Sequence, residues 1–483
     1  MLKQESSQYL IESVSGIRGI YNQSINEQLV QKYVLAYFRL FKQRDCLVIG
    51  GDSRLSTPVL KKAFIKAFSQ CGVKKIIDVS TVPVQVCEYA VIRFKAQGGA
   101  YITASHNEPE YNGWKFLKED GALLNVKQSE LLIKQAHQIC NPLKELTFTK
   151  QKTTIVNCHQ AAVNNYINFI LCRLGAQNIS QIKKAKFKVL ADPNGGSAIA
   201  VLSKLFKKLG VEAKIINNEL GKFNRLVEPN QESLTYLAPK LHSGHFSFAC
   251  GFDCDADRVE LVLPPNSYFV RDMGSTVVSG NYVLALACEA ILACTHGQIV
   301  VANDATSCLV RDVVKKYQAK IKEAETGEMS VVEKVEKYKS LIGGEGSNGG
   351  VIIPPIKCRD GIMTIVLILK MMAQRGQSLA EILETYPRYY SQRVKLTCTP
   401  AQSIKIKNRV EAYYKTKGFK IKKTHGKNGG LKIIIDKNSF LWLRQSKTEI
   451  NTLRLIVDCD EREKVKNSLE EGEGLVKKFL LKN

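Results

Sequence analysis

Apolar and polar positions follow two different periods along the first three quarters of the chain. Three short apolar runs each end in Asp: CLVIGGD at residues 46–52, FKVLAD at 187–192 and IVVAND at 299–304. A polar turn follows each run, then apolar residues at helical spacing, and then a second strand-like run. The pattern predicts strand, turn, helix and strand, three times over.

These predicted elements indicate the class of fold. Helices are expected at residues 57–71, 197–209 and 308–317, and the strands after them at 75–79, 213–217 and 319–324. Apolar strands that alternate with helices predict an α/β fold with mixed, mainly parallel sheets covered on both faces. A repeat longer than about 100 residues favours three related α/β domains over a solenoid.

The last quarter of the chain has a different pattern. Strand-like segments and two helices, the second closing the chain, are expected at residues 392–398, 404–417, 431–436, 440–444, 453–458 and 462–481. They predict a smaller α+β domain with an antiparallel sheet. The expected domains are residues 1–150, 151–265, 266–388 and 389–483.

The composition is that of a globular protein. Apolar residues make up 45% and charged residues 24% of the 483 residues. No apolar run reaches the roughly 20 residues of a membrane helix, and the first residues, MLKQESSQYL, do not have the pattern of a secretory signal. The 14 cysteines are scattered without a CxxC pair. We therefore expect a cytoplasmic protein with no membrane segment.

The net charge of +25 leaves three interpretations open: an anionic substrate, a nucleic-acid partner or a solvated basic surface. The densest basic run consists of Lys405, Lys407, Arg409, Lys415, Lys417, Lys420, Lys422, Lys423 and Lys427. It contains no zinc-finger or RNP-type pattern, so the sequence favours a solvated face over nucleic-acid binding.

The first segment with candidate chemistry is AYITASHNEPEYNGWK at residues 100–115. Ser105 follows an apolar strand, at the end where α/β proteins place their ligands. A serine hydroxyl there can carry a phosphoryl group and pass it on. His106, Asn107 and Lys115 are candidates to neutralise or orient phosphate; the alternative is an ordinary turn with a capping serine.

The second segment is SFACGFDCDADRVELV at residues 247–262, where Asp253, Asp255 and Asp257 alternate between apolar strands. Three converging carboxylates repel one another unless a cation lies between them. Their hard oxygen atoms suit Mg²⁺, and the spacing is not that of an EF-hand. Arg258 is a candidate to contact a phosphoryl oxygen. The alternative is a solvated acidic turn.

A glycine-rich loop, LIGGEGSNGGVIIP at residues 341–354, forms the third segment. Glycines let backbone approach a ligand closely, and Glu345 and Ser347 suit the hydroxyl groups of a sugar. Glycine-rich turns are common, so this segment has little weight alone.

Phosphate-binding side chains gather in the fourth segment, FLWLRQSKTEINTLR at residues 440–454. Arg444, Ser446, Lys447, Thr448 and Arg454 cluster their donors in one loop between two strands, as in a phosphate clamp. The alternative is a basic surface turn.

Together these segments resemble the α-D-phosphohexomutase superfamily, which includes phosphoglucosamine mutase, phosphomannomutase and phosphoglucomutase. TASHNEPEYNGWK resembles its phosphoserine loop, GFDCDADR its metal loop, GGEGSNGG its sugar-binding loop, and RQSKTEINTLR its C-terminal phosphate loop. SGIRG at residues 15–19, GDSRLS at 51–56 and DPNGGS at 192–197 are supporting matches. The resemblance covers nearly the whole chain and implies three α/β domains and a smaller fourth domain around a central cleft.

Two loops depart from the family pattern. Asn348 and Gly349 stand where many relatives have Gly-His, so a histidine sometimes assigned to proton transfer is missing. In the phosphate loop Ile450 replaces Pro, and Arg454 arrives one residue late. The departure therefore concerns Arg454 and not Arg444.

The resemblance implies that a hexose 6-phosphate and a hexose 1-phosphate interconvert. Phospho-Ser105 would give a bound hexose 1,6-bisphosphate, which turns end for end and returns its other phosphoryl group to Ser105. Mg²⁺ on the three aspartates and on phospho-Ser105 would offset charge, aided by Lys115 and Arg258, while Lys115 and Arg18 are candidates for proton handling. Arg444, Ser446 and Thr448 would hold the other phosphate.

Substrate and partners follow from the same comparison. The expected partners are small sugar phosphates, and the expected assembly is a monomer or a homodimer. Glucosamine phosphate is slightly favoured over mannose or glucose phosphate, because SGIRG resembles the start of phosphoglucosamine mutases. A catalytically silent phosphosugar-binding regulator is the alternative, which only the two altered loops favour.

Overall fold

The computed structural model divides the chain into two compact units. It describes residues 10–41, 45–145 (except the side chain of residue 143), 152–295, 297–424, 429–446, 449 and 451–481. The first unit reaches Arg271 and also contains Ser275–Val278 and Gly350–Leu379; the second contains Asp272–Gly274, Ser279–Gly349 and the chain from Ala380 onward. The short helices α11 (Tyr268–Met273) and α16 (Leu379–Glu384) lie where the chain passes from one unit to the other.

A seven-stranded sheet organises the first part of the first unit, with strand order β1-β2-β6-β5-β3-β4-β7. The strands are β1 (Ile11–Ser13), β2 (Gly16–Ile20), β3 (Cys46–Gly51), β4 (Lys75–Thr81), β5 (Gly98–Ile102), β6 (Tyr111–Lys118) and β7 (Thr154–Asn157). Strands β5, β3, β4 and β7 pair in parallel, and β6, β2 and β1 continue the sheet antiparallel. The sheet is therefore mixed, and β7 extends it beyond residue 150.

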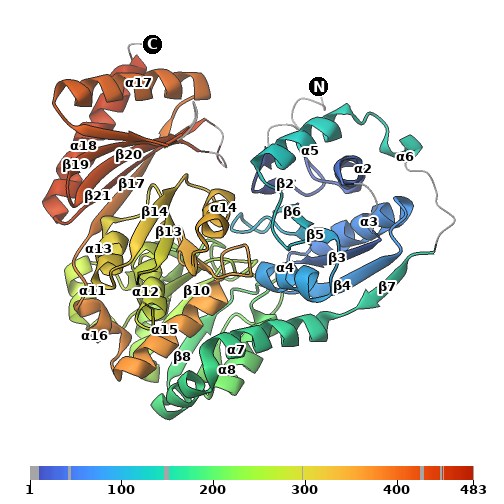
Figure 1. Ribbon diagram of the computed structural model, residues 1–483, viewed down its shortest axis with the longest axis horizontal. Helices are drawn as coiled ribbons and strands as arrows, with labels where there is room; N and C mark the ends of the chain where they lie inside the picture. The colour runs from blue at the N-terminus through green and yellow to red at the C-terminus, as the bar shows by residue number, and fades with distance from the viewer. Residues whose placement is uncertain are drawn as a thin grey trace. The chain divides into compact units, whose positions relative to one another are not determined.

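Helices cover both faces of this sheet (Figure 1). One layer consists of α2 (Glu27–Leu40), α3 (Thr57–Gln70) and α5 (Val126–Gln138), whose apolar residues share one core with the sheet. The other contains α4 (Val84–Arg93) and the long α7 (His159–Ala185). The side chains of Asn26 and Asn125 cap α2 and α5 by accepting backbone N–H groups of the first turn. A single turn, α6 (Pro142–Glu145), ends the described stretch 45–145.

The second sheet also belongs to the first unit and has the order β12-β11-β10-β8-β9. Its strands are β8 (Lys188–Asp192), β9 (Glu212–Ile215), β10 (Phe248–Phe252), β11 (Val259–Val262) and β12 (Val277–Val278). The associated helices are α8 (Ile199–Leu209), α9 (Gln231–Leu234), η1 (Thr235–Leu237) and α10 (Ala238–Gly244). Strand β16 (Val351–Ile352) and the buried helix α15 (Gly361–Arg375) return to this unit, and α15 packs on α7.

The second unit begins with a parallel arrangement of three strands. β13 (Ile299–Asn303) lies between β14 (Lys320–Ala324) and β15 (Ile342–Gly344). The helices α12 (Gly280–Leu292), α13 (Cys308–Lys316) and α14 (Glu328–Tyr338) pack around them. A side-chain hydroxyl of Ser307 caps α13.

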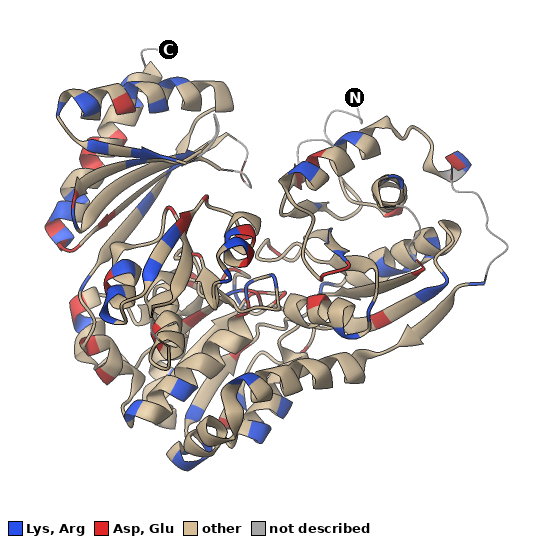
Figure 2. Ribbon diagram, viewed as in Figure 1, with Lys and Arg blue, Asp and Glu red and all other residues tan. Residues whose placement is uncertain are grey.

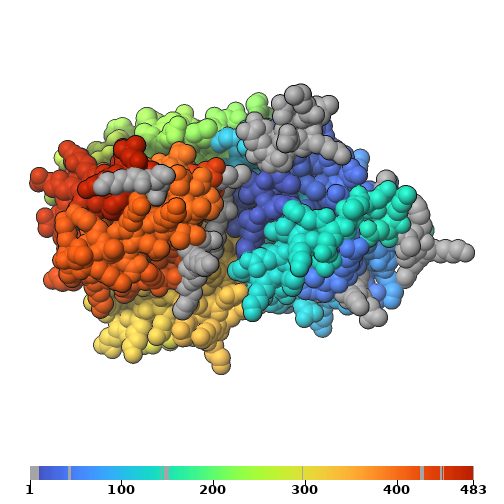
Figure 3. All heavy atoms as spheres, turned by 90° about the horizontal axis from the view of Figure 1, so that it is seen from above, coloured from blue at the N-terminus to red at the C-terminus, as the bar shows by residue number. Residues whose placement is uncertain are grey.

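The C-terminal domain of the second unit has an antiparallel sheet in the order β17-β21-β20-β19-β18. Its strands are β17 (Tyr390–Thr397), β18 (Lys420–Lys423), β19 (Leu431–Asp436), β20 (Ser439–Gln445) and β21 (Thr452–Cys459). The helices α17 (Pro400–Thr416) and α18 (Arg462–Leu481) share a core with the sheet and form the orange and red face of this domain in Figure 3.

The predicted elements and fold class are confirmed. The three repeats correspond to β3-α3-β4, β8-α8-β9 and β13-α13-β14, and α18 has the predicted bounds. Lys and Arg residues occur on helices of both units, among them α7, α8 and α17 (Figure 2). No helix among the described residues combines the length and apolar content needed to cross a membrane.

Candidate active site

Ser105 lies in a sharp turn just beyond the carboxyl end of the fully buried strand β5. Its φ of 53° is in the left-handed region, which non-glycine residues rarely adopt. Its backbone N–H donates to Oγ1 of Thr103 at 2.7 Å, and that hydroxyl donates to Oδ2 of Asp52 at 2.7 Å. These bonds fix the turn and present a serine whose residue surface is only 1% exposed.

Arg54 holds the same loop through its backbone. Its guanidinium donates to four carbonyl oxygens, of Ser105 at 2.7 Å, Glu108 at 2.6 Å, Asn107 at 2.5 Å and Tyr111 at 2.9 Å. The remaining Nε donates to Oδ2 of Asp52 at 3.1 Å. All five guanidinium hydrogens thus serve the loop and its support, which only Arg can achieve at one position.

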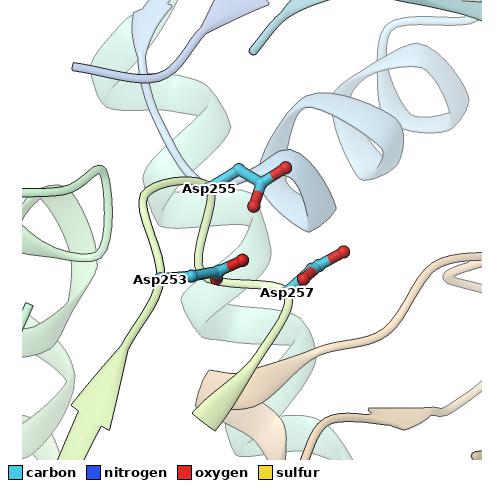
Figure 4. Close-up of side chains that lie close together, drawn as sticks. All are labelled: Asp253, Asp255 and Asp257. Atoms are coloured by element: carbon cyan, nitrogen blue, oxygen red, sulfur yellow. The ribbon is translucent and has the colours of Figure 1, made fainter. Parts of the chain in front are cut away.

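The three aspartates lie on the tight turn between β10 and β11, and their carboxylates face one space (Figure 4). One oxygen from each of Asp253, Asp255 and Asp257 lies within 4.8 Å of the others, and all three residues are fully buried. Ser105 Oγ donates to Oδ2 of Asp253 at 3.3 Å. The structure therefore brings the predicted serine and the predicted metal ligands together within one unit.

This group of oxygens fits a divalent cation. Among the described residues, Oδ1 of Asp255 and Oδ1 of Asp257 accept no hydrogen bond although both atoms are buried. Burial and the neighbouring carboxylates raise the pKa of Asp253 well above its ordinary value. A hard cation among the carboxylates would remove that repulsion and satisfy the unpaired oxygens.

Cationic side chains surround the aspartates. Lys115 Nζ lies 3.2 Å from Oδ2 of Asp255, and Arg359 Nη2 lies 2.6 Å from Oδ2 of Asp257. Arg258 Nε lies 3.8 Å from Oδ1 of Asp257, and its Nη1 donates to Glu228 at 2.6 Å. Burial alone would raise the pKa of Asp257, but Arg359, Lys115 and Arg258 hold it well below its ordinary value.

Two further predicted residues adjoin the serine loop. Arg18 donates to Oδ1 of Asn107 at 3.2 Å and to the Ser15 carbonyl at 3.4 Å. Burial lowers the pKa of Arg18 to about 10, although Asp255 opposes the shift. His106 Nδ1 lies 3.5 Å from Ser105 Oγ. Lys115, His106 and Arg258 therefore lie beside the serine or the aspartates, and Arg18 contacts the serine loop at Asn107.

The predicted sugar-binding residues belong to the second unit. Oε1 of the buried Glu345 accepts hydrogen bonds from Asn303 Nδ2 at 2.9 Å and from the backbone of Gly327 at 2.8 Å. Ser347 is exposed on the same loop and donates to Asn348 at 3.4 Å. The loop thus fixes one carboxylate and exposes one hydroxyl.

The predicted phosphate loop connects β20 and β21. Arg444 is buried, and its guanidinium donates to Oε1 of Glu325 at 2.7 Å and to the Thr326 carbonyl at 2.6 Å. Ser446 Oγ accepts the backbone N–H of Glu449 at 3.1 Å, and Arg454 lies 3.5 Å from the Glu449 carboxylate. Lys447, Thr448 and Ile450 lie outside the described residues.

Three families, which describe successive domains of one kind of enzyme, match most of the chain. Residues 11–141 match Phosphoglucomutase/phosphomannomutase, alpha/beta/alpha domain I, residues 164–265 match domain II, and residues 279–389 match domain III. The chain belongs to the phosphoglucomutase/phosphomannomutase family. It is a phosphohexomutase, an isomerase that transfers a phosphoryl group intramolecularly.

Curated relatives support this assignment over nearly their whole length. A phosphoglucomutase/phosphomannomutase of Thermococcus kodakarensis is 30% identical, with 96% of this chain and 98% of the relative covered. A phosphoglucosamine/phosphogalactosamine mutase of Sulfurisphaera tokodaii is 26% identical, with coverage of 95% and 98%. These relatives are named as mutases, so the regulatory alternative is not favoured.

Solved structures confirm the fold of the phosphohexomutase. A phosphoglucomutase/phosphomannomutase family protein from Burkholderia thailandensis matches with a TM-score of 0.78 at 20% identity, covering 97% of each chain. N-acetylphosphoglucosamine mutase of Aspergillus fumigatus, solved with GlcNAc-6P and magnesium, matches with a TM-score of 0.60 at 14% identity, covering 99% of each chain.

Sequence reasoning missed three residues that the phosphohexomutase places at or beside the predicted site. Arg54 and Asp52 occur in the supporting motif GDSRLS, but no role was predicted for them. Arg359 contacts Asp257 from more than 100 positions away in the chain. Its neighbour Asp360 caps α15 by accepting the N–H of Met363. The sequence could have indicated this helix start, but not the contact of Arg359 with Asp257.

Proposed function

We propose that this phosphohexomutase interconverts hexose 6-phosphates and hexose 1-phosphates through a phosphoserine at Ser105 and a transient hexose 1,6-bisphosphate. The observation that supports this best is the 3.3 Å contact between Ser105 Oγ and Oδ2 of Asp253. This contact lies inside a buried group of three carboxylates and several Lys and Arg side chains. A nucleophilic oxygen beside a cation site and fixed positive charges is what phosphoryl transfer requires.

The proposed cation is Mg²⁺, held by Asp253, Asp255, Asp257 and an oxygen of phospho-Ser105. When bound, it would neutralise negative charge on the phosphoryl oxygens. Carboxylate oxygens and phosphate are the ligands Mg²⁺ prefers, and no soft donor belongs to the group. The magnesium in the solved A. fumigatus mutase is consistent with this choice.

The protein side chains would carry out charge and proton handling. In the first half-reaction the bond between phosphorus and Ser105 Oγ breaks and a bond to the free sugar hydroxyl forms. Lys115 and Arg258 would stabilise the charge, since both already lie against the carboxylates. The hydroxyl must lose its proton, and Lys115 and Arg18 are the proposed proton-handling residues, with His106 beside the serine orienting phosphate.

The second half-reaction requires the substrate to bind by either end. Arg444, Ser446, Thr448 and Arg454 are proposed to bind the phosphate that is not reacting, and Glu345 and Ser347 the sugar hydroxyl groups. Arg444 is the strongest of the phosphate ligands, because a planar guanidinium matches a phosphate group in two hydrogen bonds. Its present partner, the Glu325 carboxylate, has the same two-oxygen geometry as a phosphate edge.

The proposed substrate is a neutral or amino hexose phosphate, with glucosamine phosphate slightly favoured. The two relatives compared above carry names of both kinds. A carboxylate such as Glu345 accepts hydrogen bonds from hydroxyl groups and also tolerates an ammonium group. The kcat/KM values for the 1-phosphates of glucosamine, mannose and glucose decide the question, and a preference of about a hundredfold for mannose would overturn the glucosamine choice. We place the reaction in the cytoplasm, since none of the 14 cysteines, all of which lie in the described residues, forms a disulfide.

A coupled assay of the purified protein on hexose 1-phosphates tests the proposal. Turnover should stop on chelation and return with Mg²⁺. Asp255→Asn should raise the Mg²⁺ concentration needed for half-maximal rate, whereas Asp45→Asn, at an exposed position, should not. Full turnover after removal of metal, or an unchanged Mg²⁺ requirement in Asp255→Asn, would contradict the metal assignment.

A further inference from the structure

A basic groove lies between the two domains of the second unit. It has a volume of about 680 Å³, with α13 and β14 on one side and β18 and β19 on the other. This volume falls within the range of small-molecule sites, roughly 300–1,000 Å³. The lining contains none of Glu345, Ser347, Arg444, Ser446 or Arg454, so the groove differs from the sugar and phosphate loops, although its Asn303 also donates to Glu345.

Three pairs of basic residues contribute to the lining. Lys320 and Lys322 alternate on β14, and Lys420 and Lys422 alternate on β18, so each pair faces one side of its strand. A third pair, Arg311 and Lys315, is one helical turn apart on α13 and lies on one face of that helix. Figure 2 shows basic residues on α13 and β14.

The positive charge of the groove is only partly neutralised. Eight Lys and Arg residues line it, against the two carboxylates of Glu323 and Asp436. Glu323 is shared by Lys422 at 3.3 Å and Lys432 at 3.2 Å. Among the described residues, the lining lysines without an ion pair are Lys315, Lys320, Lys322, Lys420 and Lys437, of which Lys322 has its Nζ over the ring of Tyr338. The groove is therefore an electropositive concavity with donors available for an anion.

Apolar side chains also line the groove. Val314, Ile321, Ile434 and Phe440 belong to the lining; Ile321 and Ile434 are partly exposed, and Val314 and Phe440 are buried. Lys432 is buried, and its Nζ lies 3.9 Å from the centroid of the Phe440 ring. A ligand that combines an apolar ring with several negative charges would match both features, whereas inorganic phosphate would use only the lysines.

We propose that this groove is a second ligand site, which binds a small polyphosphate carrying a planar ring, of the nucleoside diphosphate or triphosphate class. The phosphates lie between Lys320 and Lys420, which line the groove without an ion pair, and the ring lies on the apolar part of the lining. The site accounts for part of the net charge of +25, which the proposed catalytic reaction leaves unexplained.

Isothermal titration calorimetry at about 150 mM NaCl without Mg²⁺ tests the proposal, with ATP, tripolyphosphate and adenosine as probes. ATP should bind at one site, and the double variant Lys320→Glu with Lys420→Glu should weaken it by at least about tenfold. The control, Lys207→Glu with Lys208→Glu on the exposed face of α8, should stay within about twofold of wild type. Saturating glucose 1-phosphate should not displace ATP, because the groove contains none of the proposed sugar or phosphate ligands.

Each other result would overturn the proposal. The second site would be refuted if ATP did not bind, or if it bound wild type, the groove variant and the α8 control with equal affinity. Displacement of ATP by glucose 1-phosphate would refute it as well. If tripolyphosphate bound as tightly as ATP, the groove would not recognise the ring. If adenosine bound as tightly as ATP, the groove would not recognise the phosphates. Binding of a single-stranded oligonucleotide but not of ATP, lost in the groove variant, would make the groove a nucleic-acid surface instead.

Discussion

Arg359 Nη2 donates a 2.6 Å hydrogen bond to Oδ2 of Asp257, and both residues are buried. This contact places a permanent positive charge beside three carboxylates. Because the carboxylates repel one another, Arg359 stabilises the metal-free protein, and a bound cation partly duplicates its effect.

The first prediction follows from that duplication. Arg359→Gln should destabilise the metal-free protein by roughly 3–5 kcal/mol, as expected when one partner of a buried ion pair is removed. Added Mg²⁺ should raise the melting temperature of this variant more than that of wild type. Thermal unfolding with EDTA and with Mg²⁺ measures both effects, and Arg93→Gln, at an exposed position, is the control. Equal Mg²⁺ shifts in variant and wild type would show that Arg359 acts only in packing.

Arg54 gives the second prediction. Its four bonds to backbone carbonyls hold the loop that carries Ser105. Arg54→Lys keeps the charge but has three donors in place of five, so at least two acceptors of the loop lose their bonds. We expect kcat to fall by about tenfold or more, in line with the cost of small misplacements at a reacting centre. The control Arg93→Lys should leave kcat unchanged. A normal kcat in Arg54→Lys would contradict the proposal that Arg54 positions the serine loop.

How much of this arrangement could be predicted from sequence depends on the distance between the partners. The Asp253–Asp255–Asp257 alternation is local, and its apolar flanking strands pointed to a buried site, which the structure bears out. The contact between Ser105 and Asp253 joins residues 148 positions apart and was expected only from the family resemblance. The hydrogen bonds from Arg54 to the serine loop join residues about 50 positions apart, and no periodic pattern in the sequence predicts them.

The strength of the apolar periods also decided which elements of the fold were predictable. Strands and helices of the three repeats were predicted because their apolar periods are strong, and α18 was predicted with its observed bounds. The antiparallel additions β1, β2 and β12 were not predicted, since β1 and β12 have only three and two residues and β2 (GIRGI) has two glycines and an arginine among its five. The sequence also contained no sign that β16 and α15, which lie within residues 266–388, belong to the first unit, because only tertiary packing places them there.

The third prediction concerns Arg444, which is already paired with Glu325. Arg444→Ala should raise KM by about tenfold or more with kcat changed much less, because the lost interaction binds substrate and transition state equally. Glu325→Gln should lower KM, since it removes a carboxylate that competes with phosphate for the guanidinium. Steady-state kinetics on one hexose 1-phosphate distinguishes the two. If Glu325→Gln raised KM as Arg444→Ala does, the pair would be structural.

Asp458 provides a fourth, pH-dependent prediction within the second unit. It accepts hydrogen bonds from Ser307 Oγ at 3.0 Å, from the Cys308 N–H at 2.9 Å and from Ser391 Oγ. Burial raises the pKa of Asp458 to about 6 in spite of these bonds. Between the unfolded pKa, near 3.9, and pH 6 the folded protein therefore holds a proton that the unfolded chain has released.

Stability from Asp458 is fully present below the unfolded pKa and is lost as the pH rises through 6. The unfolding free energy of wild type minus that of Asp458→Asn should thus increase by roughly 1–3 kcal/mol from pH 7 to pH 4.5. Urea titrations at several pH values measure it. A difference that stays constant over this range would mean that Asp458 does not take up a proton on folding.

The central claim is that Ser105 carries the phosphoryl group, and intact-protein mass spectrometry tests it most directly. After incubation with glucose 1,6-bisphosphate and Mg²⁺, wild type should gain the mass of one phosphoryl group, which peptide mapping should assign to Ser105. Excess hexose 1-phosphate should then remove it. Ser105→Ala should lack both the added mass and the mutase activity, whereas Ser56→Ala, at a serine outside the proposed machinery, should retain both. Full mutase activity in Ser105→Ala, or a transferable phosphoryl group mapped to another residue, would contradict the account.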